Sequence, residues 1–131
     1  MIGVDSTFII DLLKSGGSAE TFEPYAEEDL STSEIVVYEV LQGIYGSRYF
    51  NETLLKTFEA LLDTFTFVFP IDRKASRLAA KISAELQHAG KSIPHSDVLI
   101  AGCFLANGCL SILTKNKKDF ERIEGLRVLG Y

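Results

Sequence analysis

The chain alternates short apolar segments with longer segments in which apolar residues recur every three or four positions. Strands are predicted at residues 1–4, 30–33, 65–69 and 109–114, with a last strand ending near Leu129. A clear example of helical spacing is the set Leu54, Leu55, Phe58, Leu61 and Leu62. Strands that alternate with helices predict a three-layer α/β/α sandwich with a central, mainly parallel sheet.

Polar residues that favour helix N-termini precede four predicted helices: Ser6 or Thr7, Ser33, Asn51 and Asp72. The first of these helices is expected to end at Gly16-Gly17, and the last to stop before Gly90. A further helix is expected over residues 21–28. Residues 97–106 are almost wholly apolar, which predicts a helix buried on all sides.

Length and composition fit one domain that spans residues 1–131. Hydrophobic residues make up 47% of the chain and charged residues 24%, as in ordinary globular proteins. We find no apolar run long enough for a membrane span and no N-terminal secretory signal, so a cytoplasmic protein is expected. Cys103 and Cys109 lack the spacing of a zinc or redox site and are expected to be buried thiols.

The net charge of -5 is unusual for a protein that binds nucleic acid, because phosphate groups favour a basic surface. Bound cations would offset part of this charge if several acids formed one metal site. The basic residues also cluster in two segments, which hold Arg73, Lys74, Arg77 and Lys81, and Lys115, Lys117 and Lys118.

Four acidic residues stand where a parallel sheet would bring them together. Asp5 ends the first strand, Asp119 follows the strand that ends at Thr114, and Asp97 begins the apolar helix. The carboxyl ends of parallel strands share one edge of the sheet, where such folds place their sites. Each acid also has an ordinary structural explanation, such as a helix cap at Asp5 or a favourable helix dipole at Asp97.

Glu39 is harder to explain as a structural residue, because its helical neighbours are apolar. A charged group on a buried face requires a partner or a metal ion. Gly43, one turn later, is expected to permit close approach at that point. Converging carboxylates repel one another, and a hard divalent ion such as Mg²⁺ or Mn²⁺ relieves that repulsion. The two histidines, His88 and His95, are too few and too distant for a zinc site.

Four motifs occur in the order and approximate spacing of a known family. They are Asp5-Ser6, residues 39–43, residues 93–97 followed by Ile100-Ala101, and residues 114–120. Through them the chain resembles the PIN-domain family and, within it, the VapC-type toxins of toxin–antitoxin systems. The resemblance covers essentially the whole chain. It departs from the family at His95, where a small or amide residue is more usual; this residue is interpreted as loop structure or as a substrate contact.

The resemblance implies an α/β/α sandwich that cleaves RNA with Mg²⁺ or Mn²⁺. It assigns the acidic, catalytic and metal-binding cluster to Asp5, Glu39, Asp97 and Asp119, with Ser6, Thr114 and Asn116 as supporting polar residues. Metal-assisted hydrolysis of the phosphodiester is the mechanism implied. The sequence leaves open the RNA that is cleaved, the number of metal ions and the role of Glu39.

The resemblance also implies a homodimer and inhibition by a small antitoxin protein. Aromatic and apolar residues just after Glu39 are candidate anchors for these contacts: Tyr38, Ile44, Tyr45, Tyr49 and Phe50. Two other functions stay open. A phosphatase or phosphotransfer domain would use Asp5 as nucleophile, but such enzymes usually have a second aspartate at the position of Thr7. A non-catalytic interaction module would leave the four acids unexplained.

Overall fold

A parallel sheet forms the centre of the molecule. The computed structural model describes residues 1–14 and 23–131. In these described residues, five strands joined by parallel pairings follow the order β3-β2-β1-β4-β5. Their bounds are β1 Ile2–Val4, β2 Leu30–Ser33, β3 Val68–Phe69, β4 Ser111–Leu113 and β5 Arg127–Leu129. The chain adds strands on one side of β1 and then on the other, so the order reverses between β1 and β4.

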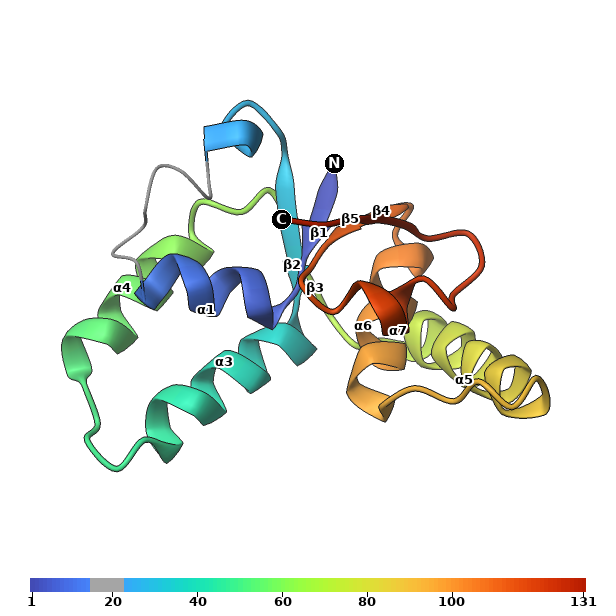
Figure 1. The fold of residues 1–131 in the computed structure, drawn as a ribbon. Helices are drawn as coiled ribbons and strands as arrows, with labels where there is room; N and C mark the ends of the chain where they lie inside the picture. Colours follow the sequence, from blue (N-terminus) through green and yellow to red (C-terminus); the bar gives the residue numbers. More distant parts are fainter. Residues whose placement is uncertain (15–22) are drawn as a thin grey trace.

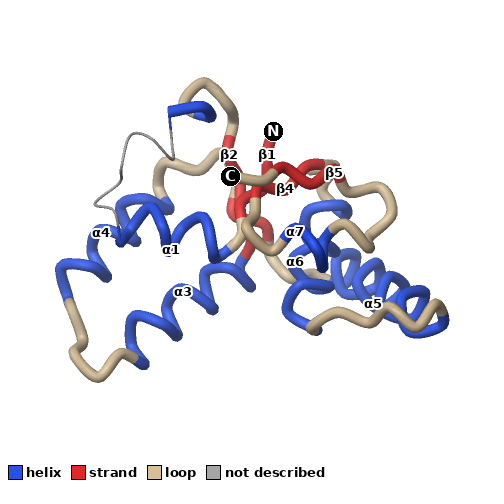
Figure 2. Tube along the Cα trace, viewed as in Figure 1, coloured by secondary structure: helices blue, strands red, loops and turns tan. Residues whose placement is uncertain are grey.

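Helices cover both faces of the sheet, as Figures 1 and 2 show. One layer contains α1 (Ser6–Lys14), α3 (Glu34–Gly46) and α4 (Glu52–Leu62). The other contains α5 (Arg73–His88), α6 (His95–Ala106) and the short α7 (Lys117–Phe120). The predicted three-layer α/β/α sandwich is therefore confirmed. None of the described helices combines the length and apolar character that a membrane crossing requires.

Three of the predicted helix caps are confirmed. The side chains of Ser33, Asn51 and Asp72 accept hydrogen bonds from backbone N–H groups in the first turns of α3, α4 and α5. For α1, the cap expected at Ser6 or Thr7 was wrong, and the alternative expectation, a cap at Asp5, is confirmed. The Phe8 N–H donates to Asp5 Oδ1 over 3.3 Å. The cap of α1 and the first candidate acid of the site are thus the same residue.

Other differences from the predicted elements have local causes. The helix expected over residues 21–28 is reduced to a single 3-10 turn, η1 (Glu23–Tyr25), in the part of that range that is described. Pro24 lies inside it, and proline supplies no N–H for a continuing helix. Strand β3 is shorter than predicted and lies at the edge of the sheet, where it has a neighbour on one side only. The predicted helix end at Gly16-Gly17 lies outside the described residues.

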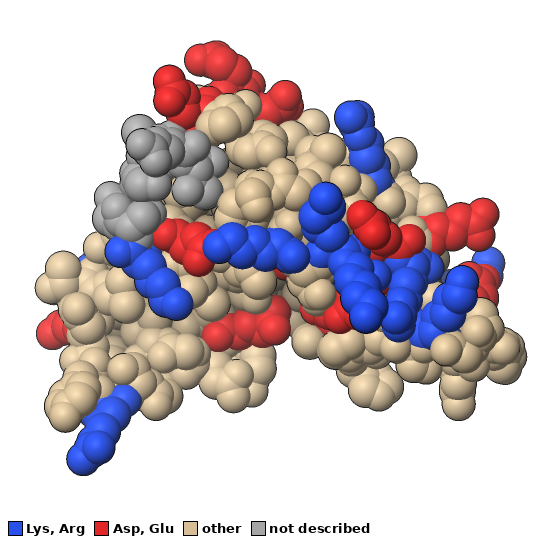
Figure 3. Space-filling model, in the orientation of Figure 1, with Lys and Arg blue, Asp and Glu red and all other residues tan. Residues whose placement is uncertain are grey.

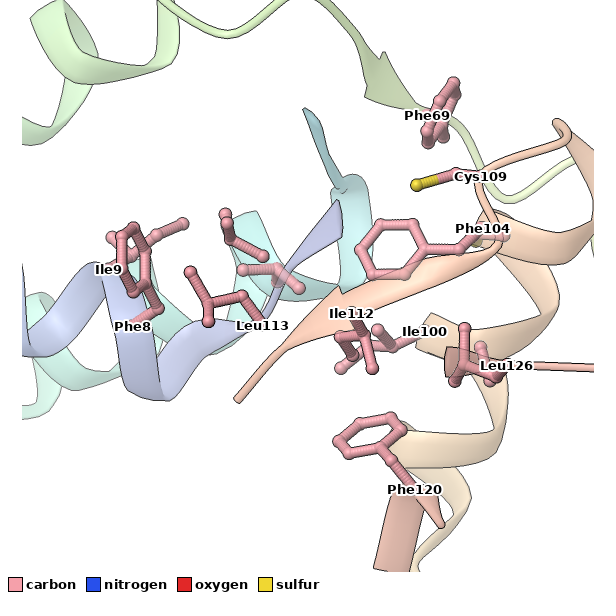
Figure 4. Close-up of a cluster of buried hydrophobic side chains, with 14 of the residues drawn as sticks. Phe8, Ile9, Phe69, Ile100, Phe104, Cys109, Ile112, Leu113, Phe120 and Leu126 are labelled. Carbon is pink, nitrogen blue, oxygen red and sulfur yellow. The ribbon is translucent and has the colours of Figure 1, made fainter. Parts of the chain in front are cut away.

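The core lies between the sheet and its helices, and α6 is the most deeply buried helix. Its residues Val98, Ile100, Ala101, Gly102, Cys103, Phe104 and Ala106 are buried, as the apolar sequence predicts. Figure 4 shows Phe104 and Ile100 of α6 beside Ile112 of β4. Cys103 and Cys109 are buried free thiols, as expected. Because this helix is held firmly on all sides, its first turn provides a fixed platform at the edge of the sheet.

Candidate functional site

The predicted site residues meet at the edge formed by the carboxyl ends of the strands. Val4 of β1 is in register with Leu113 of β4. Asp5 and Thr114 therefore leave the sheet side by side, at the point where the strand order reverses. This reversal is the position at which open parallel sheets usually place their ligand sites.

Asp5 is held by hydrogen bonds on both carboxylate oxygens. Its Oδ2 accepts from the Thr114 hydroxyl, and its Oδ1 accepts from Thr7 Oγ1 at 2.6 Å. Only 3% of Asp5 is exposed. Burial raises the pKa of this carboxyl, whereas the hydrogen bonds from Thr114, Thr7 and the Phe8 backbone partly lower it again. The side chain is therefore fixed in orientation, and these donors favour its charged form.

Asn116 joins two further acids of the predicted cluster. Its side-chain amide donates to Asp97 Oδ2 at 3.0 Å and to Asp119 Oδ2 at 3.1 Å. Asp97 lies in the first turn of α6 and Asp119 in α7. One amide group thus holds two carboxylates from different helices next to each other, which like charges would otherwise oppose.

Glu39 reaches the same region from α3. Burial raises its pKa, the Asp5 carboxylate raises it further, and a hydrogen bond with the Ser6 side chain lowers it. Its Oε1 is buried and has no hydrogen-bond partner. Such an atom is costly unless a cation or a water molecule satisfies it. Gly43, by contrast, faces open space, because an added Cβ there would have no neighbour within 4 Å among the described residues. The close approach expected at this glycine is therefore not seen in that part of the chain.

Asp97 lies within electrostatic reach of the other three acids. The pKa of Asp97 is raised from 3.8 to about 6, first by burial and then by Asp119, Glu39 and Asp5, whereas Asn116 lowers it. Oxygen donors of this kind suit a hard divalent cation. Within residues 1–14 and 23–131, however, no three metal-ligating side chains stand close enough to hold one ion as placed. The donor chemistry nevertheless fits Mg²⁺ or Mn²⁺, because these ions are commonly bound by one or two carboxylates together with water molecules.

Two residues near the acids were not predicted to belong to the site. Thr7 donates to Asp5, and the Lys115 N–H donates to Thr7 Oγ1 at 3.3 Å. In the sequence, only their positions indicate a role at the site: Thr7 lies two residues after Asp5, and Lys115 lies between Thr114 and Asn116. His95 is exposed at the first position of α6, two residues before Asp97, and belongs to the helix instead of the preceding loop. His88 is exposed at the end of α5, as expected.

Comparison with known proteins agrees with this fold. The PIN domain family matches residues 2–126. A relative from Rickettsia felis, "Ribonuclease VapC1", is 31% identical over 128 residues, which cover 96% of this chain and 92% of that protein. The "tRNA(fMet)-specific endonuclease VapC" of Shigella flexneri is 30% identical over 97 residues, which cover 72% of this chain and 70% of that protein.

A solved structure shows the same fold. The crystal structure of VapBC2 from Rickettsia felis, bound to a DNA fragment from its promoter, superposes with a TM-score of 0.86 at 21% identity, covering 100% of this chain and 99% of that chain. The family match, over residues 2–126, extends over the segments that carry the four acids. The chain therefore belongs to the PIN-domain family, and within it is similar to the VapC ribonucleases.

Proposed function

We propose that this protein is a divalent-metal-dependent endoribonuclease, the toxin of a toxin–antitoxin pair, with residues 1–131 as a single nuclease domain. The observation that carries the proposal is the convergence of acids at one edge of the sheet, where Asn116 bridges Asp97 and Asp119 and the charges of Asp119, Glu39 and Asp5 raise the pKa of Asp97. Relatives named VapC are described as a ribonuclease and as a tRNA-specific endonuclease. A structural scaffold would gain nothing from such a repelling cluster.

Each acid has a proposed role that follows from its surroundings. Asp5 and Asp97 would hold Mg²⁺ or Mn²⁺ directly, with Asp119 beside Asp97 as a further ligand. Glu39, whose Oε1 has no partner, would hold a second ion or orient the attacking water. When bound, the ion would supply Lewis-acid chemistry that activates water and stabilises the charge developing on the phosphate.

The supporting residues keep these acids in place. Thr114 fixes one oxygen of Asp5, and Asn116 bridges Asp97 and Asp119. Ser6 interacts with Glu39. These neutral donors orient carboxylates without neutralising them, so the acids retain their charge for a cation. Removing Thr114 or Asn116 would release the carboxylates that their side chains hold.

The proposed RNA substrate would contact the basic side chains around this edge. Lys117 and Lys118 of α7 follow β4 closely and are exposed. Figure 3 shows a row of basic side chains across one face, next to acidic side chains. Lysine side chains next to an acidic metal site are suited to an RNA backbone, because they attract the phosphates without occupying the acids.

The partners proposed are an antitoxin and a second copy of the chain. Solved relatives of this fold are VapBC complexes. Of the five residues predicted as anchors, Ile44 is only 5% exposed and belongs to the core. The other four are well exposed, from 49% for Phe50 to 80% for Tyr49. Exposed aromatic residues of this density favour protein contacts.

Cleavage assays test the function directly. The purified protein is expected to cleave single-stranded or loop RNA with Mg²⁺ or Mn²⁺ and to stop when EDTA is added. Asp5→Asn and Asp97→Asn should each abolish cleavage while the proteins stay folded, as judged by circular dichroism. Glu59→Gln, an exposed acid of α4 far from the site in sequence, serves as the control and should cleave like the parent.

Each alternative function has its own outcome in this assay. Undiminished cleavage in EDTA, or full activity of either site variant, would refute the assignment. A folded parent that cleaves no RNA with either metal would favour the interaction module. A trapped aspartyl-phosphate on Asp5 would favour phosphotransfer, although both oxygens of Asp5 are already engaged by hydrogen bonds.

A further inference from the structure

Three consecutive residues after β4 connect the acids of the site. The Thr114 hydroxyl donates to Asp5. The Asn116 backbone N–H donates to Thr114 Oγ1 at 2.8 Å, and its side chain donates to Asp97 and Asp119. A shift of this segment, residues 114–116, would therefore move the donors of three carboxylates together.

The middle residue of the segment, Lys115, attaches it to α1 through both its backbone and its side chain. Its N–H donates to Thr7 Oγ1, which in turn donates to Asp5. Its Nζ lies 2.6 Å from Asp11 Oδ2. Asp11 is one helical turn after Thr7, so both contacts fall on the same face of α1.

Tyr131 completes this attachment. Its hydroxyl donates to Asp11 Oδ2 at 2.9 Å, and the Lys115 ammonium lies 5.3 Å from the centre of its ring. The same ring packs edge to face on the buried Phe8 of α1, with centroids 5.3 Å apart. Lys115 is thus held by an anion and an aromatic face, both of which are themselves fixed to α1.

We propose that Lys115, Asp11 and Tyr131 form an anchor that positions residues 114–116 and, through them, Asp5. We call these three the Lys115 anchor. Its members are positioning residues, since they hold the donors of the acids instead of touching substrate. The inference rests on the proposed function, because the geometry that the anchor maintains is that of the proposed metal site.

The rival role for Lys115 is direct contact with an RNA phosphate. Its side chain is 56% exposed, which allows such a contact, but its ammonium already has Asp11 and Tyr131 as partners. The two roles differ at Asp11. Under the anchor, loss of the Asp11 charge releases the segment; under direct contact, the same loss frees the lysine for RNA.

The test uses Asp11→Asn, Lys115→Met and Lys115→Arg in the full chain. The first two variants are each expected to lose about tenfold in Mn²⁺ affinity, measured by calorimetry without RNA, and about tenfold in kcat. KM for RNA and its salt dependence should stay unchanged. The double variant should lose no more than the worse single one, and Lys115→Arg should recover most of both losses. Lys118→Met, which removes an exposed charge on α7, is the control for Mn²⁺ affinity and should keep it.

Several results would overturn the anchor. One is an Asp11→Asn protein with parental Mn²⁺ affinity and equal or higher activity. Another is a Lys115→Met protein whose defect is confined to KM, with a salt slope reduced by about one, which would indicate a phosphate contact. If the parent cleaves no RNA, the proposed function fails by itself, and Mn²⁺ affinity still decides the anchor: a loss in both variants supports it and equal affinity refutes it.

Discussion

Asp97→Asn is expected to stabilise the metal-free protein at neutral pH while abolishing its activity. The substitution removes one charge from a cluster in which Asp119, Glu39 and Asp5 all raise the pKa of Asp97. The asparagine keeps an oxygen that can accept the hydrogen bond from Asn116, so the fold loses little in exchange. A residue proposed for catalysis would then be one that costs stability, as expected where function requires like charges to converge.

The size of the effect follows from the pKa. In the folded protein the pKa of Asp97 is about 6, against 3.8 for an ordinary aspartate. The folded state therefore holds the proton more tightly, and ionisation lowers the free energy of unfolding. The difference corresponds to at most about 3 kcal/mol. Because Asp97 is only half-buried, solvent screening reduces this to about 1–2 kcal/mol.

The pH window distinguishes this cause from a general effect of the substitution. The cost of ionising Asp97 is absent below the unfolded pKa near 4 and complete above the folded pKa near 6. In EDTA, the variant and the parent should therefore melt alike at pH 4. At pH 7–8 the variant should melt higher by roughly 3–10 °C. Thermal unfolding followed by circular dichroism across this range measures the difference, with Glu59→Gln as the control.

Metal ions give the second half of the same experiment. Mg²⁺ or Mn²⁺ should raise the free energy of unfolding of the parent by about 2.7 kcal/mol at a hundredfold excess over Kd, and its melting temperature should rise accordingly. The melting temperature of Asp97→Asn should rise much less. If parent and variant melt alike in EDTA at pH 8 and metal changes neither, the reasoning about clustered charge is refuted. A gain that persists unchanged at pH 4 would show that the stabilisation has another source.

Two further sets of variants test packing and partners. Gly102→Ala would place a Cβ 2.7 Å from that of Ala79 and should lower the free energy of unfolding by about 1–3 kcal/mol, because it forces α5 and α6 apart. Gly43→Ala in α3 has open space and should raise the free energy of unfolding by up to about 1 kcal/mol. Urea unfolding measures both changes, and a Gly102→Ala protein as stable as the parent would contradict the packing. Sedimentation should show a dimer at micromolar concentration, and a strict monomer would contradict the proposed dimer. Glu39→Gln should weaken the antitoxin complex more than Glu59→Gln does, and equal affinities of the two variants for the antitoxin would contradict a contact with the acidic site.

The convergence of the four acids could be predicted because it depends on topology more than on side-chain detail. Once the strands are known to be parallel, Asp5 and Thr114 must leave the sheet at the same edge. The apolar sequence of α6 then indicates a buried helix, so its acid Asp97 is expected to lie partly inside the protein. Glu39 was identified by the contrast between its charge and its apolar neighbours, and its partnerless Oε1 agrees with that contrast.

What could not be predicted depends on individual side-chain placements. The sequence does not decide which of Asp5, Ser6 and Thr7 caps α1, because all three adjacent polar residues could serve. Nor does it connect Lys115 with Asp11 and Tyr131, which are 104 and 16 positions away along the chain. The open space at Gly43 was missed for the same reason: glycine in a helix indicates neither a neighbour nor its absence.

The net charge of -5 conflicts with RNA binding only when the charge is averaged over the chain. Four exposed acids, Glu23, Glu27, Glu28 and Asp29, lie just before β2, at the edge of the sheet opposite the site. The lysines that follow β4 lie at the site edge instead, and Figure 3 shows basic side chains separated from the acidic group at the top of the molecule. Because charges beyond about 8–10 Å are screened at physiological salt, the remote acids contribute little where the proposed RNA would bind. The local field is set by the lysines and by the acids that a bound cation would neutralise.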